Sequence, residues 1–178
     1  MDTRIEDYLT NADRFSAVVA GAHDWDGQSP CEDWTAVDVL FHVVDTQRDF
    51  LDKRGADLGK LAATDPAARW DTHVEQVRGV VADEAFVTEE YDGYFGRTTI
   101  ADTMANFYGF DMLVHRWDLA RAVGSDVTWT DAEMDSLEAN IDALGDNLYT
   151  HDVCKGPLDV SADAPRQERL LARLGRRP

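Results

Sequence analysis

The sequence predicts an all-α fold, an up-and-down four-helix bundle followed by a short extra C-terminal helix. Apolar residues recur at helical spacing over long segments, the connections between these segments are short, and no segment shows a convincing alternation of apolar and polar residues. The chain has 178 residues, a length that suits one domain with one core. We therefore expect residues 1–178 to form a single domain.

Two helices are predicted at the start of the chain. The first covers 3–22, and a turn-rich segment that contains Gly21 ends it. The second begins at Thr35, a favourable N-cap residue, and Asp38 three positions later suits the positive end of the helix dipole. This second helix is expected to end near Gly55.

The middle of the chain is expected to hold two more helices. One covers 65–83, because Pro66 lies where proline is favoured, at a first helical position. Residues 85–98 contain two glycines and fit either a short hairpin or an irregular loop. The other helix covers 99–123 and closes on Gly124, a residue type that commonly follows a helix end.

The C-terminal third is predicted to contain one more long helix and one short helix. The sequence T-D-A-E reads as a capping box and opens a helix over 130–149. Residues 151–165 are expected to form a loop. The short helix then has Asp163 as its cap, Pro165 near its start and Gly175 just beyond its end.

Charge and hydropathy exclude some classes of partner. The formal net charge of −18 disfavours binding to nucleic acid and to anionic lipid, because like charges repel. No stretch approaches the roughly 18 consecutive apolar residues that span a bilayer, and the N-terminus lacks the apolar run of a signal peptide. We therefore expect a cytoplasmic protein with no nucleic-acid or membrane partner. An acidic, solvated surface explains the charge without any ligand.

Two cysteines are too few for a disulfide framework. Cys31 lies just before a helix N-terminus, which could lower a thiol pKa, but a packing role is favoured. Cys154 lies in a loop and is interpreted as incidental. The sequence also lacks a glycine-rich phosphate loop, a G-x-S-x-G elbow and a CxxC pair.

The helix expected over 99–123 carries ionisable side chains on its apolar face. Asp111, His115 and Asp118 share this face with a run of apolar residues. These are Ile100, Met104, Phe107, Tyr108, Val114, Leu119 and Ala122. Asp111 and His115 are four positions apart, the spacing at which a helix presents two ligands to one metal. A buried Asp–His pair without a metal explains the same spacing, and is the commoner origin of such a pattern.

Asp118 fits more than one role. It could orient a metal ligand, cap a neighbouring loop, or pair with Arg14 or another arginine. We favour a structural role or one in orienting a ligand.

His42, in the second helix, is the third candidate ligand. It lies on a stripe shared with Asp38, Asp45 and Asp49, so periodicity alone favours a solvated histidine. Val39 and Val43 widen the apolar arc toward His42 and weaken that interpretation. The remaining histidines, His23, His73 and His151, have no matching ligand spacing.

Two motifs resemble those of a known family. The segment SPCEDWTAVDVLFHVV resembles the P-C-x-x-W-T-x-x-D-L-x-x-H entry to the second helix of DinB-like proteins. The segment DMLVHRWDLARAVG resembles the D/E-x-x-x-H-x-W-D-L-A-x-A-x-G signature of the same superfamily. Both are most similar to the N-terminal domain of mycothiol-dependent maleylpyruvate isomerases, and DAPRQERLLARLGRRP is similar to the tail of short actinobacterial metal-binding members.

The resemblance implies a DinB-like metal-binding domain whose ligands are His42, Asp111 and His115. The larger isomerases use Glu where this chain has Asp111, and the shorter side chain should keep oxygen ligation. Two imidazoles and one carboxylate leave positions open for water or substrate. Zinc suits this donor set best, and nickel, cobalt, manganese and iron are further candidates.

The resemblance also implies a function. The leading hypothesis is a metal-dependent enzyme that uses a low-molecular-weight thiol, of the mycothiol type, for S-transfer to a small electrophile or for its isomerisation. Tyr108 or Arg116 could contact the substrate. The isomerases carry a further C-terminal domain that contributes to the active site, and the resemblance covers only the bundle.

Two other readings remain open. One is a non-catalytic metal- or ligand-binding bundle, with a stress-related role as one candidate, and the other is a member whose metal site is empty. DNA binding is not expected, because the sequence has no basic surface signature. A homodimer formed through helix faces is a candidate assembly.

Overall fold

The computed structural model describes residues 1–31, 33–61, 63–94, 96–150 and 154–177. The described residues are mostly helical, which confirms the predicted all-α helical bundle. Three of its helices are α1 (Thr3–Ala20), α2 (Ala36–Lys53) and α3 (Pro66–Val81). The fourth is continuous through α5 (Ile100–Thr103), the π turn η1 (Met104–Tyr108) and α6 (Gly109–Ala122).

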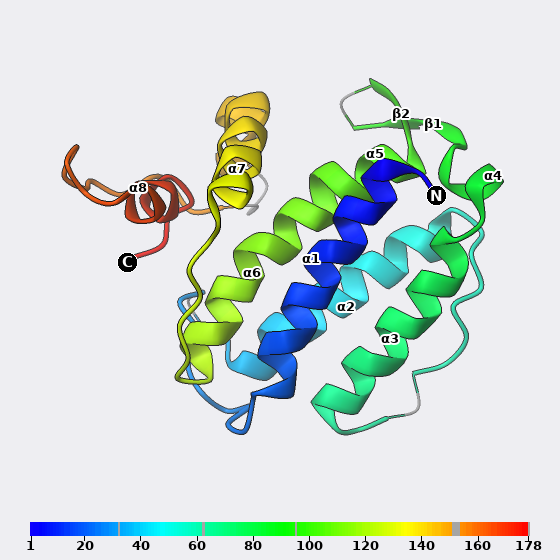
Figure 1. Ribbon diagram of the computed structural model, residues 1–178, viewed down its shortest axis with the longest axis horizontal. Coiled ribbons are helices and arrows are strands. Elements are labelled where there is room, and N and C mark those ends of the chain that lie inside the picture. Colours follow the sequence, from blue (N-terminus) through cyan, green and yellow to red (C-terminus); the bar gives the residue numbers. More distant parts are fainter. Residues whose placement is uncertain (32, 62, 95, 151–153, 178) are drawn as a thin grey trace.

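The bundle contains one crossover connection, so its helices do not alternate strictly in direction as the predicted up-and-down order requires. Figure 1 shows that α2 and α3 run in the same direction, whereas α1 and α6 run opposite to them. The connection 54–65 therefore returns along the length of α2. Its 12 residues can span about 40 Å, and the 18-residue helix α2 is about 27 Å long. The connection is thus long enough for α3 to pack against both α1 and α2.

The remaining elements flank the bundle. Helix α4 (Glu84–Val87) precedes an antiparallel hairpin of β1 (Glu90–Gly93) and β2 (Gly96–Thr99), with Glu90 opposite Thr99, so the hairpin alternative for 85–98 is the one observed. Helix α7 (Asp131–Leu144) packs on α6, and the 3-10 turn η2 (Gly145–Tyr149) and α8 (Arg166–Arg173) pack on α7 (Figure 1). None of the described helices is both long enough and apolar enough to cross a membrane.

Two predicted boundaries in the C-terminal third are wrong. The predicted helix over 130–149 stops at Leu144, because Gly145 adopts a positive φ of 51° and a 3-10 turn follows. Helix α8 begins only at Arg166 and is not capped by Asp163. The backbone N–H of Asp163 instead donates to the hydroxyl of Ser161.

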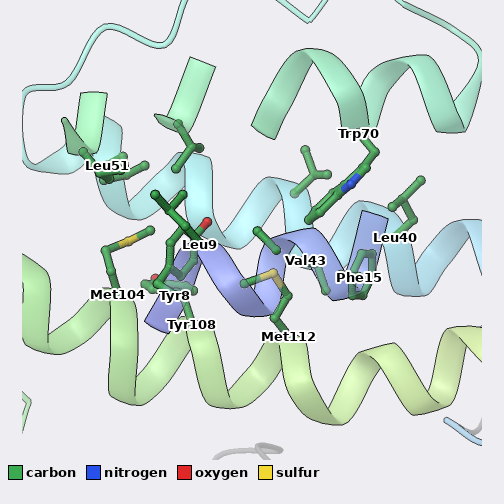
Figure 2. Packing of buried hydrophobic residues seen from close by; sticks show 14 of the residues in the cluster. Tyr8, Leu9, Phe15, Leu40, Val43, Leu51, Trp70, Met104, Tyr108 and Met112 are labelled. Atoms are coloured by element: carbon green, nitrogen blue, oxygen red, sulfur yellow. The ribbon is translucent and has the colours of Figure 1, made fainter. Parts of the chain in front are cut away.

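Helix α6 borders two clusters of buried apolar residues, where the sequence suggested one core. The first lies among α1, α2, α3 and α6 and includes Phe15, Trp70 and Met112 (Figure 2). The second lies among α6, α7 and α8 and includes Leu113 and Trp117. Because α7 packs on the side of α6 that faces away from the bundle, and α8 adds to the same apolar cluster, α6 is buried over most of its surface.

The helix expected over 99–123 is interrupted by the π turn η1. The N–H of Gly109 donates to the carbonyl of Met104, five residues back instead of four. The extra residue changes the register of the helix on either side of the turn. As a result Phe107, expected on the buried apolar face, is 42% exposed.

The connection between α1 and α2 packs tightly against the end of α6. A Cβ atom at Gly27 would lie only 2.0 Å from the carbonyl oxygen of Ala122, so only glycine fits there. The carbonyl of Gly27 accepts from the N–H of Ala36 at 2.8 Å, and Gln28 forms a bridge with Thr35. This close approach holds residues 27–31 and 33–35 beside the end of α6.

A buried polar group joins α1, α2 and α3. The hydroxyl of Tyr8 donates to Gln47 Oε1 at 2.6 Å, and His73 Nε2 lies 2.9 Å from the same oxygen and donates to it as the second donor. Burial, together with the nearby charges of Arg48 and Arg69, lowers the pKa of His73 to about 3. His73 is therefore neutral in the folded protein at ordinary pH.

We expect His73 to make the protein less stable in mild acid. Below pH 6.5 the unfolded chain binds a proton at this imidazole while the folded protein, whose His73 pKa is about 3, does not. The free energy of unfolding should therefore fall with decreasing pH, by up to about 1.4 kcal/mol per pH unit from this group. Urea titrations at pH 7 and pH 5 should show a smaller loss in His73→Leu than in the wild type. An identical loss in both would contradict the assignment.

Candidate metal centre

Three predicted ligand side chains meet where α2 packs on α6. His42 comes from α2, and Asp111 and His115 come from successive turns of α6. Asp111 Oδ1 lies 3.3 Å from His115 Nε2 and 3.6 Å from His42 Nε2. One potential ligand atom from each residue lies within 4.8 Å of the other two. The structure therefore brings together the three residues that the sequence selected.

These three side chains are partly withdrawn from solvent. The side chain of His115 is 8% exposed, that of Asp111 22% and that of His42 31%. His42 does not lie on a solvated face, as its periodicity favoured, because α2 turns it toward α6. Asp111 Oδ2 is buried and accepts no hydrogen bond from the described residues. Burying a carboxylate oxygen without a partner costs free energy. A cation or a hydrogen-bond donor beside this atom would offset that cost.

The charges of these residues are strongly coupled. Burial alone would raise the pKa of Asp111, but His115 and His42 outweigh it and hold that pKa well below its usual range. Burial alone would lower the pKa of His115, but Asp111 and Asp118 outweigh it and raise that pKa well above its usual value. The arrangement therefore favours an anionic carboxylate facing a positive charge, which either a proton on His115 or a metal cation can supply.

Asp118 fixes the orientation of the His115 ring. Its Oδ2 lies 2.9 Å from His115 Nδ1, so that nitrogen carries the donated proton and Nε2 faces Asp111. Asp118 is fully buried and also accepts two hydrogen bonds from Arg176, at 2.8 and 3.2 Å. The arginine partner is thus Arg176 and not Arg14, which pairs with Glu133 at 2.8 Å. Such a carboxylate–histidine contact commonly sets the tautomer of a metal ligand.

An open pocket of about 450 Å³ adjoins the three ligands. Trp34 forms part of its wall, with its ring centroid 4.8 Å from that of His42 and 5.8 Å from that of His115. Phe107, exposed by the π turn, forms part of the wall as well. His42, Asp111 and His115 all line the pocket, so a small molecule in it would lie beside the ligand cluster.

Both cysteines lie at this pocket, although the sequence gave them a packing role and an incidental one. Cys31 Sγ lies 3.4 Å from Asp118 Oδ2 and 3.5 Å from Arg176 Nη2, and Cys154 Sγ lies 3.6 Å from Arg176 Nη1. Cys31, His115 and Asp118 also form a second group of potential metal ligands. The guanidinium of Arg176 already neutralises Asp118 in that group, which makes it the weaker candidate.

Other residues considered from the sequence lie elsewhere. Arg116 does not reach the pocket, because it is buried in an ion pair of 2.7 Å with Glu133. Tyr108 is buried and packs on Phe50 with a centroid distance of 5.1 Å. His73 belongs to the core, and His151 lies outside the described residues. Sequence reasoning missed Arg176, because no local pattern links it to Asp118, 58 residues earlier.

We expect the Asp118–Arg176 pair to be important for stability. Arg176→Met leaves a fully buried carboxylate with only His115 to balance it, which should lower the free energy of unfolding by about 3 kcal/mol. The control is Arg121→Met, which breaks an exposed pair with Asp126 and should cost less than about 1 kcal/mol. Urea unfolding of chelator-treated protein measures both. Equal, small losses would contradict the expected role of the buried pair.

Comparison with known proteins identifies a family for this chain. The family model described as the mycothiol maleylpyruvate isomerase N-terminal domain matches residues 8–120. Searches of curated proteins and of solved structures found no significant match. The matched region spans more than half of the chain and includes His42, Asp111 and His115. The chain therefore belongs to the DinB-like family of mycothiol maleylpyruvate isomerase N-terminal domains.

Proposed function

We propose that this protein binds one divalent metal ion through His42, Asp111 and His115 and acts as a metal-dependent enzyme with a low-molecular-weight thiol. The reaction is S-transfer to, or isomerisation of, a small electrophile, and mycothiol is the thiol that the family suggests. The observation that carries the proposal is the Asp111 carboxylate: its Oδ1 lies 3.3 Å from His115 Nε2 and 3.6 Å from His42 Nε2, and its Oδ2 is buried without a partner among the described residues. A cation at this point would satisfy all three side chains.

The donor set favours a catalytic or substrate-binding metal site over a structural one. Structural zinc sites are usually closed by four protein ligands, whereas two imidazoles and one carboxylate leave at least one position open. Zinc suits these ligands best, and nickel, cobalt, manganese and iron remain candidates. When bound, the metal would stabilise a thiol as its thiolate and so lower the thiol pKa.

The protein's own side chains have separate tasks in this scheme. Asp118 holds the proton on His115 Nδ1 and so keeps Nε2 directed at the ligand cluster. Arg176 donates two hydrogen bonds to Asp118, which fixes that carboxylate, and also borders the pocket. The rings of Trp34 and Phe107 form apolar walls that limit the access of water to the reacting atoms.

We expect purified, tag-free wild-type protein to contain about one metal ion per chain. His42→Ala and His115→Ala should each lose it, because each removes one of three ligands. His23→Ala, a change at an exposed histidine outside the site, is the matched control and should keep the metal. Inductively coupled plasma mass spectrometry measures the content. Wild-type protein that stays metal-free after incubation with Zn²⁺, Ni²⁺ or Mn²⁺ would rule out the proposal.

We expect the metal-loaded protein to accelerate the addition of mycothiol to an activated alkene. A new S–C bond forms at one alkene carbon, and a proton adds to the other. A free thiol is only a few per cent ionised at pH 7, so full conversion to thiolate can raise the rate by up to about 30-fold before positioning is counted. His115→Ala should show only the uncatalysed rate. Metal binding without turnover would favour a non-catalytic metal-binding bundle instead.

A further inference from the structure

A second, larger cavity lies next to the metal-site pocket. It has a volume of about 860 Å³ and lies among the end of α2, the β1–β2 hairpin, η1 and the end of α7. This volume is within the range of known small-molecule sites. Phe107 forms part of the wall of both cavities, so the two cavities lie on either side of this residue.

Arg54 presents a charge to this cavity without a matching anion. Its guanidinium carbon lies 4.0 Å from the centroid of the Tyr91 ring and 5.8 Å from that of Phe50. Its Nε is buried without a hydrogen bond, and its guanidinium forms no ion pair with any described residue. The aromatic rings hold the side chain in place by cation–π contact. Its hydrogen-bond donors are left for a ligand.

The other charges that line the cavity do not neutralise Arg54. Arg97 pairs with Glu90 at 2.8 Å, and Asp102 pairs with Arg4 at 2.8 Å. Asp92 lies on the exposed side of the hairpin, opposite Arg97 in the strand register. Arg54 is thus the half-buried charge of the wall that lacks a counter-ion among the described residues.

The remaining wall suits a flat, apolar body. The rings of Phe50, Tyr91, Phe107 and Tyr108 line the cavity, and Phe107 is an exposed residue. Aromatic walls of this kind favour planar ligands through stacked and edge-on contacts. A single guanidinium balances one negative charge, and a chain of net charge −18 opposes the entry of a dianion.

We propose that this cavity binds a small monocarboxylate with an aromatic or other planar apolar body, its carboxylate on Arg54 and its apolar end against Phe107 and Tyr108. A guanidinium donates two parallel hydrogen bonds to a carboxylate, a geometry that favours a carboxylate over other anions of the same charge. Binding itself does not require the metal. Only the role of the cavity as a substrate subsite, with the ligand extending past Phe107 toward the metal, rests on the proposed function.

The test uses 2-naphthoate as the probe and isothermal titration calorimetry as the measurement, on the full chain. Wild-type protein should bind 2-naphthoate, and Arg54→Gln should weaken this binding by about tenfold or more, because a charge-assisted hydrogen bond is lost. Arg54→Lys keeps the charge and should retain part of the affinity. Arg97→Gln, which changes a nearby arginine already paired with Glu90, is the control and should bind as the wild type does. The neutral 2-naphthamide should bind the wild type weakly, and its affinity for Arg54→Gln should be the same.

The same titrations on chelator-treated protein separate this proposal from that of the metal site. Unchanged naphthoate binding without metal, sensitive to Arg54, supports the cavity even if the metal site proves empty. Equal binding by the wild type and Arg54→Gln would overturn the proposal. A second result would also overturn it: naphthoate binding is lost in His115→Ala or after chelation, while Arg54→Gln binds as the wild type does. The carboxylate would then lie on the metal. No binding by wild-type protein at millimolar naphthoate would also overturn it.

Discussion

The burial of α6 on nearly all sides is the constraint on which the site depends. Most of this helix is withdrawn from solvent, so its buried ionisable residues need partners inside the protein, and Arg121 near its end is the one that stays exposed. Arg116 forms an ion pair with Glu133 of α7, and Asp118 pairs with Arg176 and with the ring of His115. Of the two carboxylates on α6, Asp111 is the one that keeps a buried oxygen, Oδ2, without a hydrogen-bond partner among the described residues. The metal proposal follows from this oxygen.

Much of the fold could be predicted, because it depends on local patterns. Apolar spacing and N-caps such as Thr35 located α1, α2 and α3 to within a few residues. The π turn escaped prediction, because no residue pattern distinguishes a five-residue turn from a regular helix over 99–123. The early end of α7 depends on Gly145, which has a positive φ. The sequence alone does not distinguish a glycine with a positive φ from one inside a regular helix.

The candidate site, too, could be predicted only where it depends on local sequence patterns. The spacing of Asp111 and His115 fixed their relation, because both lie on one helix. His42 could not be assigned from periodicity, because which side of α2 faces α6 is decided by tertiary packing; only the family resemblance selected it. Arg176 gave no signal at all, since its contact with Asp118 spans 58 residues. Long-range pairing of this kind is set by the complete fold.

The position of Phe107 has a consequence for how the two cavities affect each other. One ring, displaced outward by the π turn, forms part of the wall of the 450 Å³ pocket and of the 860 Å³ cavity. An occupant of one cavity that shifts this ring changes the free energy of filling the other. Thermodynamic linkage makes this coupling reciprocal, so each ligand must alter the affinity of the other by the same factor.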